Sequence, residues 1–351
     1  MITLHPTRLI YDFDLPELTT LLEAWGYPSF RARQLWQGLY RNLWSGPEAF
    51  RTLPGDLRQR LADEFTFSHL RPATTLHSTD GETEKTLFYL PDGSPVETVR
   101  MRYLRRRTLC ISTQSGCAMG CTFCATGQMG LRRNLTSGEI AEQALYYARQ
   151  LAERGERVTN IVVMGMGEPF HNYEATLAAI DRLNHPQGMN LGARRFTIST
   201  VGLIPGIERL TRERRQVNLA ISLHAADDDL RASMLPVNQK YPIADLIAAV
   251  RRYTEATRRR VTFEWALIHG VNDTPEQARK LAALIQGLLA HVNVIPLNPT
   301  VGFEGQATTP ERARRFQTIL DEHGTPCTIR LRRGIDIQAG CGQLAQANTP
   351  P

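Results

Sequence analysis

Residues 110–130 read CISTQSGCAMGCTFCATGQMG. Cys117, Cys121 and Cys124 share the compact spacing C-x-x-x-C-x-x-C, and Cys110 stands outside it. A closed structural zinc site needs four ligands, usually as two pairs, and no second pair follows here. Three thiolates on one short loop can instead hold three irons of a 4Fe-4S cluster and leave the fourth iron open. The stretch therefore predicts a cluster-binding loop with a further thiol nearby.

The loop follows the first of six strand-like segments that alternate with helical segments from residue 107 onward. The strands are expected at RTLCIST (107–113), VTNIVVMG (from about 157), RFTIST (195–200), VNLAISLH (217–224), VTFEWALI (261–268) and HVNVIPL (291–297). Helical periodicity lies between them, as in 137–154, 243–259 and 275–290. This alternation predicts an α/β fold with a parallel sheet curled into a (β/α)6 partial barrel. Such folds place their chemistry at the C-terminal strand ends.

The chain before this barrel has a different pattern. Helical periodicity at 15–26, 30–42 and 54–65 predicts a small helical domain. Residues 85–104 alternate on both sides of Asp92-Gly93, which predicts a connecting β-hairpin. We therefore divide the chain into a helical accessory domain (1–84), a hairpin extension (85–102), a core (103–335) and a C-terminal segment (336–351).

The composition favours a cytoplasmic enzyme. The chain has 351 residues, of which 42% are hydrophobic, enough for a large packed core. No apolar run is long enough to span a membrane, and the N-terminus lacks the apolar stretch of a signal peptide. In the reducing cytoplasm, the six cysteines are expected to be metal ligands or reactive thiols.

Basic residues favour an anionic partner such as RNA. The formal net charge is +6, and almost all positive charge is arginine. Arginine binds phosphate and stacks on bases. The arginine clusters are Arg105–Arg107, Arg132–Arg133, Arg194–Arg195, Arg258–Arg260, and Arg330 with Arg332 and Arg333. Arginine-biased codon usage and solvated surfaces remain alternative explanations of the same pattern.

Two motifs resemble those of radical S-adenosylmethionine (SAM) enzymes. CAMGCTFC (117–124) resembles their cysteine signature, with Phe123 just before the last cysteine. VVMGMGEP (162–169) resembles the segment that meets the methionine amino group, with Gly167 and Glu168 in the matching places. The resemblance implies that polar strand ends also contact SAM. These are Ser199, Ser222, Leu223, His224 and Asn298.

Within that superfamily the chain resembles the RlmN and Cfr RNA methyltransferases. GIDIQAGCGQL (334–344) resembles their C-terminal segment, which places the methyl-carrying cysteine at Cys341. Cys110 matches their second essential cysteine. The likeness extends from about residue 85 through VETVRM, TLCIS, GCAMGCTFCATG, RNLTSGEI, GMGEP, ISLHA and IPLNP.

The resemblance implies a radical mechanism. Carbon 2 of adenine has no nucleophilic lone pair, so it cannot simply attack the methyl group of SAM. One SAM methylates Cys341, and a second SAM yields a 5'-deoxyadenosyl radical that activates this methyl group. Cys110 then releases the methylated base by forming a transient disulfide with Cys341. Either Glu97 or Cys110 accepts the proton from carbon 2.

The implied partners are 23S ribosomal RNA, tRNA modified beside the anticodon, and an electron donor such as flavodoxin or ferredoxin. Cys327 has no motif partner and is expected to be a buried small hydrophobe. Two alternative functions remain: Cfr-like methylation at adenine carbon 8, and a non-catalytic metal-binding RNA protein. The N-terminal helices could dock RNA or only pack against the core, and Glu97 could be an exposed hairpin residue.

Overall fold

The computed structural model describes residues 8–298, 300–330, 334, 336–337, 340 and 342–348. In this part of the chain the main sheet has ten strands, in the order β1-β2-β3-β4-β7-β8-β9-β10-β11-β12. Neighbouring strands from β4 onward run parallel, whereas β1 to β4 pair antiparallel. The parallel strands are β4 (Arg107–Cys110), β7 (Asn160–Val163), β8 (Phe196–Thr200), β9 (Asn218–Ser222), β10 (Val261–Leu267), β11 (Ala290–Pro296) and β12 (Cys327–Ile329). This order confirms the predicted α/β partial barrel.

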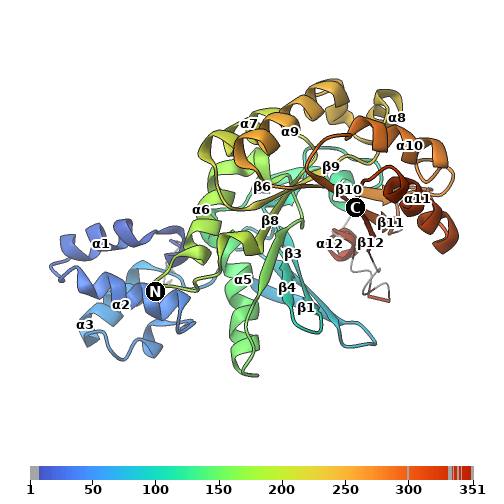
Figure 1. Cartoon of the computed structure of the whole chain (residues 1–351). Helices are drawn as coiled ribbons and strands as arrows, with labels where there is room; N and C mark the ends of the chain where they lie inside the picture. Colours follow the sequence, from blue (N-terminus) through green and yellow to red (C-terminus); the bar gives the residue numbers. More distant parts are fainter. Residues whose placement is uncertain are drawn as a thin grey trace.

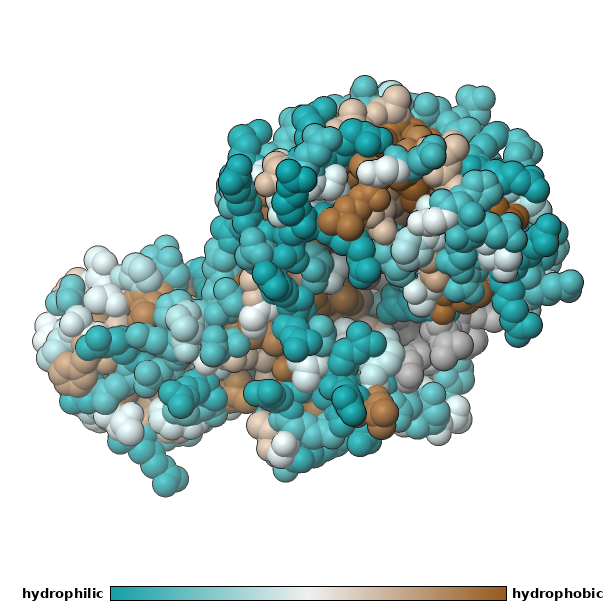
Figure 2. Space-filling model, in the orientation of Figure 1, coloured by the Kyte–Doolittle hydropathy of each residue, from teal (hydrophilic) through white to brown (hydrophobic). Residues whose placement is uncertain are grey.

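Helices connect the parallel strands and cover the outer side of the curved sheet (Figure 1). They are α5 (Ser137–Ala152), α6 (Tyr173–Asn184), α7 (Ile204–Glu213), α8 (Asp228–Met234), α9 (Ile243–Thr257), α10 (Pro275–Leu284) and α11 (Pro310–Glu322). Their inner faces are buried and their visible outer faces are mostly hydrophilic (Figure 2). Of the described helices, none combines the length and apolar character needed to cross a lipid bilayer. Cys327 is buried in β12, as predicted.

The N-terminal helices lie to one side of the barrel (Figure 1). They are α1 (Leu15–Ala24), α2 (Phe30–Tyr40) and α3 (Gly55–Glu64), which confirms the three predicted helical segments. Their buried side chains form one continuous hydrophobic core with those of the barrel helices. Polar contacts reinforce the join, because Arg182 Nη2 donates to the backbone oxygen of Asp12 over 2.6 Å and Trp36 Nε1 donates to His185 Nδ1 over 3.2 Å. The helices therefore pack firmly against the core.

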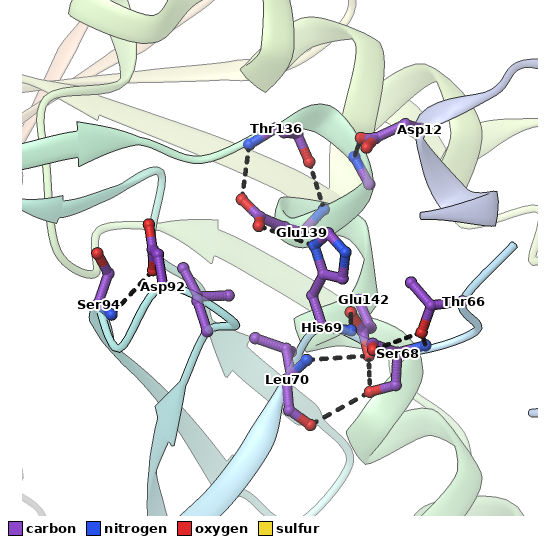
Figure 3. A network of polar contacts seen from close by, with 12 residues as sticks. Asp12, Thr66, Ser68, His69, Leu70, Asp92, Ser94, Thr136, Glu139 and Glu142 are labelled. Atoms are coloured by element: carbon purple, nitrogen blue, oxygen red, sulfur yellow. Dashed lines mark hydrogen bonds and ion pairs between the residues drawn. The ribbon is translucent and has the colours of Figure 1, made fainter. Parts of the chain in front are cut away.

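A polar network fixes this junction at the start of α5 (Figure 3). Asp12 Oδ1 accepts a hydrogen bond of 2.8 Å from the Gly138 N–H. The Glu139 carboxylate pairs with Arg133 Nη1 at 2.8 Å and with His69 Nδ1 at 3.0 Å. Burial opposes ionisation of Glu139, but these hydrogen bonds outweigh it and lower its pKa to about 2. A helix N-terminus also favours a negative charge, so this carboxylate is doubly stabilised.

Antiparallel strands join the helices to the barrel. β2 (Thr83–Tyr89) and β3 (Pro95–Arg102) form the predicted hairpin around Asp92-Gly93. β1 (Arg71–His77) adds a strand that the sequence analysis did not identify, because its side chains are mostly exposed and give no apolar alternation. The domain boundary expected after residue 84 falls inside β2. Residues 71–102 therefore form one antiparallel unit.

Candidate active site

The three cysteines of the compact motif lie on a loop closed at its base by a small two-stranded sheet. β5 (Gln114–Gly116) and β6 (Leu131–Asn134) pair antiparallel on either side of the loop. The Cys117 N–H donates to the Gly130 oxygen over 2.9 Å. Gly116 has a φ of +72°, and a Cβ there would lie 1.8 Å from that same oxygen. Only glycine fits at this position, and Gly116 therefore determines where the loop begins.

The thiols of Cys117, Cys121 and Cys124 all face one cavity of ≈ 360 Å³. Burial is the main reason that the pKa of each thiol is raised, to about 12 for Cys117, and the neighbouring thiols raise those of Cys117 and Cys121 further. Within the described residues, no group of three or more His, Cys, Asp or Glu side chains is arranged to hold a single metal ion. A cluster offers a separate iron to each thiolate, so its ligands need not converge on one point. Three thiolates on one loop facing one cavity suit an iron–sulfur cluster.

Glu168 lies where the chain leaves β7, and its carboxylate faces the same cavity. Its oxygens accept hydrogen bonds of 2.9 Å each from the backbone N–H groups of Phe170 and Val201. Gly167 precedes it with a φ of +102°, in close contact with Gln114. Burial raises the pKa of Glu168 to about 7, because neutral donors only partly replace water. A ligand ammonium group would complete this site.

The other predicted SAM contacts line the same cavity, with one exception. Ser199 Oγ and Ser222 Oγ lie 3.2 Å apart on adjacent parallel strands, and Asn298 lies beyond the end of β11. His224 Nδ1 accepts from the Ala266 N–H over 2.9 Å, so its other ring nitrogen carries the proton. Burial, with the nearby Arg231, lowers the pKa of His224 to about 3. Leu223 is fully buried and is not part of the lining.

Glu97 and Cys110 also line this cavity. They lie on the paired strands β3 and β4, where Val99 is the register partner of Cys110. Glu97 is only 2% exposed, which corrects the alternative reading of an exposed hairpin residue. Its Oε2 lies 2.9 Å from the Lys85 Nζ. Burial raises the pKa of the Cys110 thiol to about 11, although Arg330 opposes this shift.

Cys341 itself lies outside the described residues, but Gly340 and Gly342 are described on either side of it. The Lys85 Nζ donates to the Gly340 oxygen over 2.8 Å. The Gly342 N–H donates to Glu97 Oε2, also over 2.8 Å. The helix that follows, α12 (Gln343–Asn348), packs against β3 and α4 (Ala125–Gln128). The chain therefore passes the cavity wall immediately before and after Cys341.

The sequence analysis did not assign three charged residues to this site, although it named Arg330 in a basic cluster. Glu264 and Arg330 line the cavity, and Lys85 is fully buried beside it. Burial raises the pKa of Glu264, whose Oε2 accepts from Asn293 Nδ2 over 2.6 Å. Two of them could have been recognised from the sequence. Glu264 interrupts the apolar strand VTFEWAL, and Lys85 is one of few lysines in an arginine-rich chain.

Known proteins resemble this chain in sequence and in fold. The sequence profile of the Radical SAM superfamily matches residues 111–282. A radical SAM methyltransferase from Sphaerobacter thermophilus superposes with a TM-score of 0.93 at 52% identity, covering 96% of this chain and 98% of that one. A probable dual-specificity RNA methyltransferase RlmN from Chloroflexus aurantiacus is 53% identical over 98% of this chain and 94% of its own. A dual-specificity RNA methyltransferase RlmN 1 from Myxococcus xanthus is 49% identical over 95% and 93%.

The partial barrel, the cysteine loop at its mouth and these matches define a radical SAM enzyme of the methyltransferase type. Membership of that superfamily implies a 4Fe-4S cluster and SAM as cofactors. The RlmN relatives are about half identical to this chain over nearly its full length, so the chain belongs to the RlmN family. The family recognised from the sequence is thereby confirmed.

Proposed function

We propose that this enzyme methylates carbon 2 of one adenosine in 23S ribosomal RNA and of an adenosine beside the tRNA anticodon. Relatives described as dual-specificity RNA methyltransferases support an RNA substrate. One observation carries the proposal: a single cavity is lined by Cys110 and Glu97 together with the cysteine loop and Glu168. An ordinary SAM-dependent methyltransferase would need neither the cysteine loop nor a second thiol.

The cofactors would be held by residues that already share this cavity. Cys117, Cys121 and Cys124 would bind the cluster, and SAM would lie along Gly167, Glu168, Ser199, Ser222, His224 and Asn298. When bound, the cluster supplies the electron that cleaves SAM to a 5'-deoxyadenosyl radical. The Glu168 carboxylate would pair with the SAM ammonium group, since its described backbone donors are neutral. Neutral His224 would offer a ring N–H without adding charge.

Cys341 would carry the methyl group. Its thiolate would take a methyl group from a first SAM by displacement. A hydrogen atom of that methyl group would then pass to the 5'-deoxyadenosyl radical, which allows the methyl carbon to join carbon 2 of adenine. One electron and the carbon-2 proton would then leave the adduct. The Cys110 thiolate would attack the Cys341 sulfur, so that a disulfide forms as the bond from sulfur to the transferred carbon breaks, and that carbon would take up a proton to become the methyl group. Lys85 and Glu97, which bind the residues flanking Cys341, support this placement of the carrier. A reductant must finally restore both thiols, as a cytoplasmic location allows.

Glu97 is the better candidate to accept the proton that leaves carbon 2. Its carboxylate lines the cavity and lies 2.9 Å from the Lys85 Nζ. The Cys110 thiol, whose pKa burial raises to about 11, must first lose its own proton. A carboxylate on the cavity wall is a suitable general base.

The basic residues lie at different edges of the sheet, and only some are near the cavity mouth. Three clusters lie at or just before the starts of β4, β8 and β10, and therefore at the edge of the sheet opposite the cavity mouth: Arg105–Arg107, Arg194–Arg195 and Arg258–Arg260. Arg132, on β6 beside the cysteine loop, is exposed on the mouth side. The target base must leave its stack to enter the cavity. We propose that Arg132, rather than those three clusters, contacts phosphates next to the target adenosine.

Product analysis tests this function. The reconstituted enzyme is incubated with tRNA or 23S ribosomal RNA, SAM bearing a deuterated methyl group, and reduced flavodoxin or ferredoxin. We expect labelled 2-methyladenosine, and no product from Cys341→Ala. A methyl group at carbon 8 would instead assign the Cfr-like reaction, and methylation by Cys341→Ala would overturn the carrier role.

A further inference from the structure

A buried ion pair joins the hairpin to the C-terminal segment. Lys85 lies on β2 and Glu97 on β3, with Leu87 as the register partner of Glu97 and Val99 as that of Lys85. Side chains two residues apart on a strand share a face, so both charged groups point to the same side of the hairpin. Lys85 is 0% exposed and Glu97 only 2%, and their charged atoms lie 2.9 Å apart.

Both partners also bind the backbone of the C-terminal segment. The Lys85 Nζ donates to the Gly340 oxygen over 2.8 Å. Glu97 accepts two hydrogen bonds from this segment. The Gly342 N–H donates to Oε2 over 2.8 Å, and the Ala345 N–H donates to Oε1 over 2.6 Å. Hydrogen bonds to an ionised group are stronger than neutral ones, especially away from water. The pair therefore holds the chain on both sides of position 341.

The same hairpin carries a second buried ion pair, which makes no polar contact with the described residues of this segment. Glu84 and Arg100 are register partners on β2 and β3, and their side chains are in contact. Glu84 directly precedes Lys85 on β2, and Arg100 is the register partner of Glu84 on β3. Because successive side chains of a strand point to opposite faces, Glu84 and Arg100 lie on the other face of the hairpin from Lys85 and Glu97. On that face Thr98 and Thr86 contact α5, through Gln143 and Tyr147. The two pairs share the strands and the burial but face different surroundings.

We propose that Lys85 is a positioning residue: through its ion pair with Glu97 it holds the segment that carries Cys341 against the active-site cavity. This inference rests on the proposed carrier role of Cys341. Burying two charges is costly unless they are paired and fully hydrogen-bonded, and here backbone groups of the segment complete their hydrogen bonding. Loss of the lysine charge leaves Glu97 buried without its cation and weakens its hold on the Gly342 and Ala345 N–H groups.

Hydrogen exchange of the full-length holoenzyme tests this without depending on activity. In Lys85→Met, the amides of Gly342 and Ala345 should exchange about tenfold faster or more, because their charged acceptor is disturbed. Arg100→Met is the matched control, since it breaks a buried ion pair of the same hairpin. Its C-terminal peptide should exchange as in the unchanged protein. Equal exchange in all three proteins would overturn the proposal.

A second variant keeps the test decisive if Lys85→Met does not fold. Glu97→Gln has nearly the same shape but no charge for Lys85 to bind, so the same two amides should again lose protection. Protection retained in this variant would contradict the proposal. In Lys85→Met, formation of 5'-deoxyadenosine should persist while the rate of methyl transfer falls about 100-fold, with an unchanged KM for SAM, as for a misplaced reacting group.

These results separate the two proposals. If the exchange results are as expected but no methyl group is ever found on Cys341, the positioning role stands and the carrier chemistry fails. If Cys341 is methylated but Lys85→Met leaves exchange unchanged, the carrier chemistry stands and the positioning role fails.

Discussion

Glu139 and Glu168 are equally buried carboxylates in two different regions, each only 2% exposed. At the junction of the N-terminal helices and the core, Glu139 is bound by Arg133 and His69, and its pKa is lowered to about 2. In the cavity, burial raises the pKa of Glu168 to about 7, because its described donors, two backbone N–H groups and the Thr200 side chain, are neutral. The first carboxylate has its cation built into the fold. The second is left for a cation that arrives with the ligand.

Glu142 shows that the pKa alone does not identify a functional residue. Burial raises its pKa too, and its partners are the Ser68 hydroxyl and the backbone N–H groups of His69 and Leu70. Unlike Glu168, however, Glu142 does not line the cavity. A raised carboxylate pKa therefore indicates a binding site only where the carboxylate also meets an accessible space.

The largest effect is expected for Glu168→Gln. Loss of the ionised acceptor should weaken SAM binding to the reconstituted enzyme about 100-fold, as for a charged hydrogen bond worth roughly 3 kcal/mol. Its thermal stability without SAM should not fall, because a buried carboxylate without a cation has been replaced by a neutral amide. Equilibrium binding and thermal unfolding measure both. A large loss of stability would place Glu168 in the same class as Glu139.

Glu139→Gln should give the opposite pattern. Arg133 and His69 would lose a buried, ionised partner, so the free energy of unfolding should fall by about 3 kcal/mol. SAM affinity should stay the same, since Glu139 is not part of the cavity lining. Denaturant unfolding beside the same binding assay checks this. Weaker SAM binding with unchanged stability would refute the structural role.

Acid should remove the contribution of Glu139 selectively. Its folded pKa of about 2 lies below the ordinary value of 4.5, so its stabilisation is present above pH 4.5 and is lost as the pH falls toward 2. Between neutral pH and pH 3, the stability difference between the unchanged protein and Glu139→Gln should shrink by about 2 kcal/mol. Parallel unfolding curves of the two proteins at each pH measure it. A constant difference would mean that Glu139 does not titrate as stated.

The smallest effect is expected for Asp12→Ala. Its Oδ1 accepts the Gly138 N–H in the first turn of α5, and loss of such an acceptor costs about 1 kcal/mol of stability. Neither SAM binding nor cleavage should change. Asp12→Asn, which keeps an oxygen acceptor, should recover most of the loss. No recovery would mean that the charge, rather than the hydrogen bond, matters at this position.

Periodicity and spacing were enough to predict the barrel strands, the N-terminal helices and the cysteine loop, because each leaves a local pattern. β1 could not be predicted, since an exposed edge strand needs no apolar alternation. The expected SAM contacts fall on the cavity because parallel strands bring their C-terminal ends together. The exception is Leu223, whose side chain turns into the core between Ser222 and His224.

Contacts between residues that are distant in sequence could not be predicted from such local patterns. Nothing local indicates that Lys85 meets Glu97 across the hairpin, or that both bind residues near 340. The arginine clusters were visible, but only the parallel order of the strands shows that three of them lie at the edge opposite the cavity. The roles of Cys110, Cys341 and Glu97 remain predictions that chemistry must test.

Trapping the covalent intermediate tests the division of labour among the thiols most directly. Reconstituted Cys110→Ala enzyme is incubated with RNA, SAM and reductant, digested, and analysed by mass spectrometry. The account predicts an adduct in which the Cys341 sulfur is joined through one carbon to an adenine of the RNA, while the Cys110→Ala/Cys341→Ala double variant gives none. Full turnover by Cys110→Ala without an adduct, or an adduct at another residue, would contradict it.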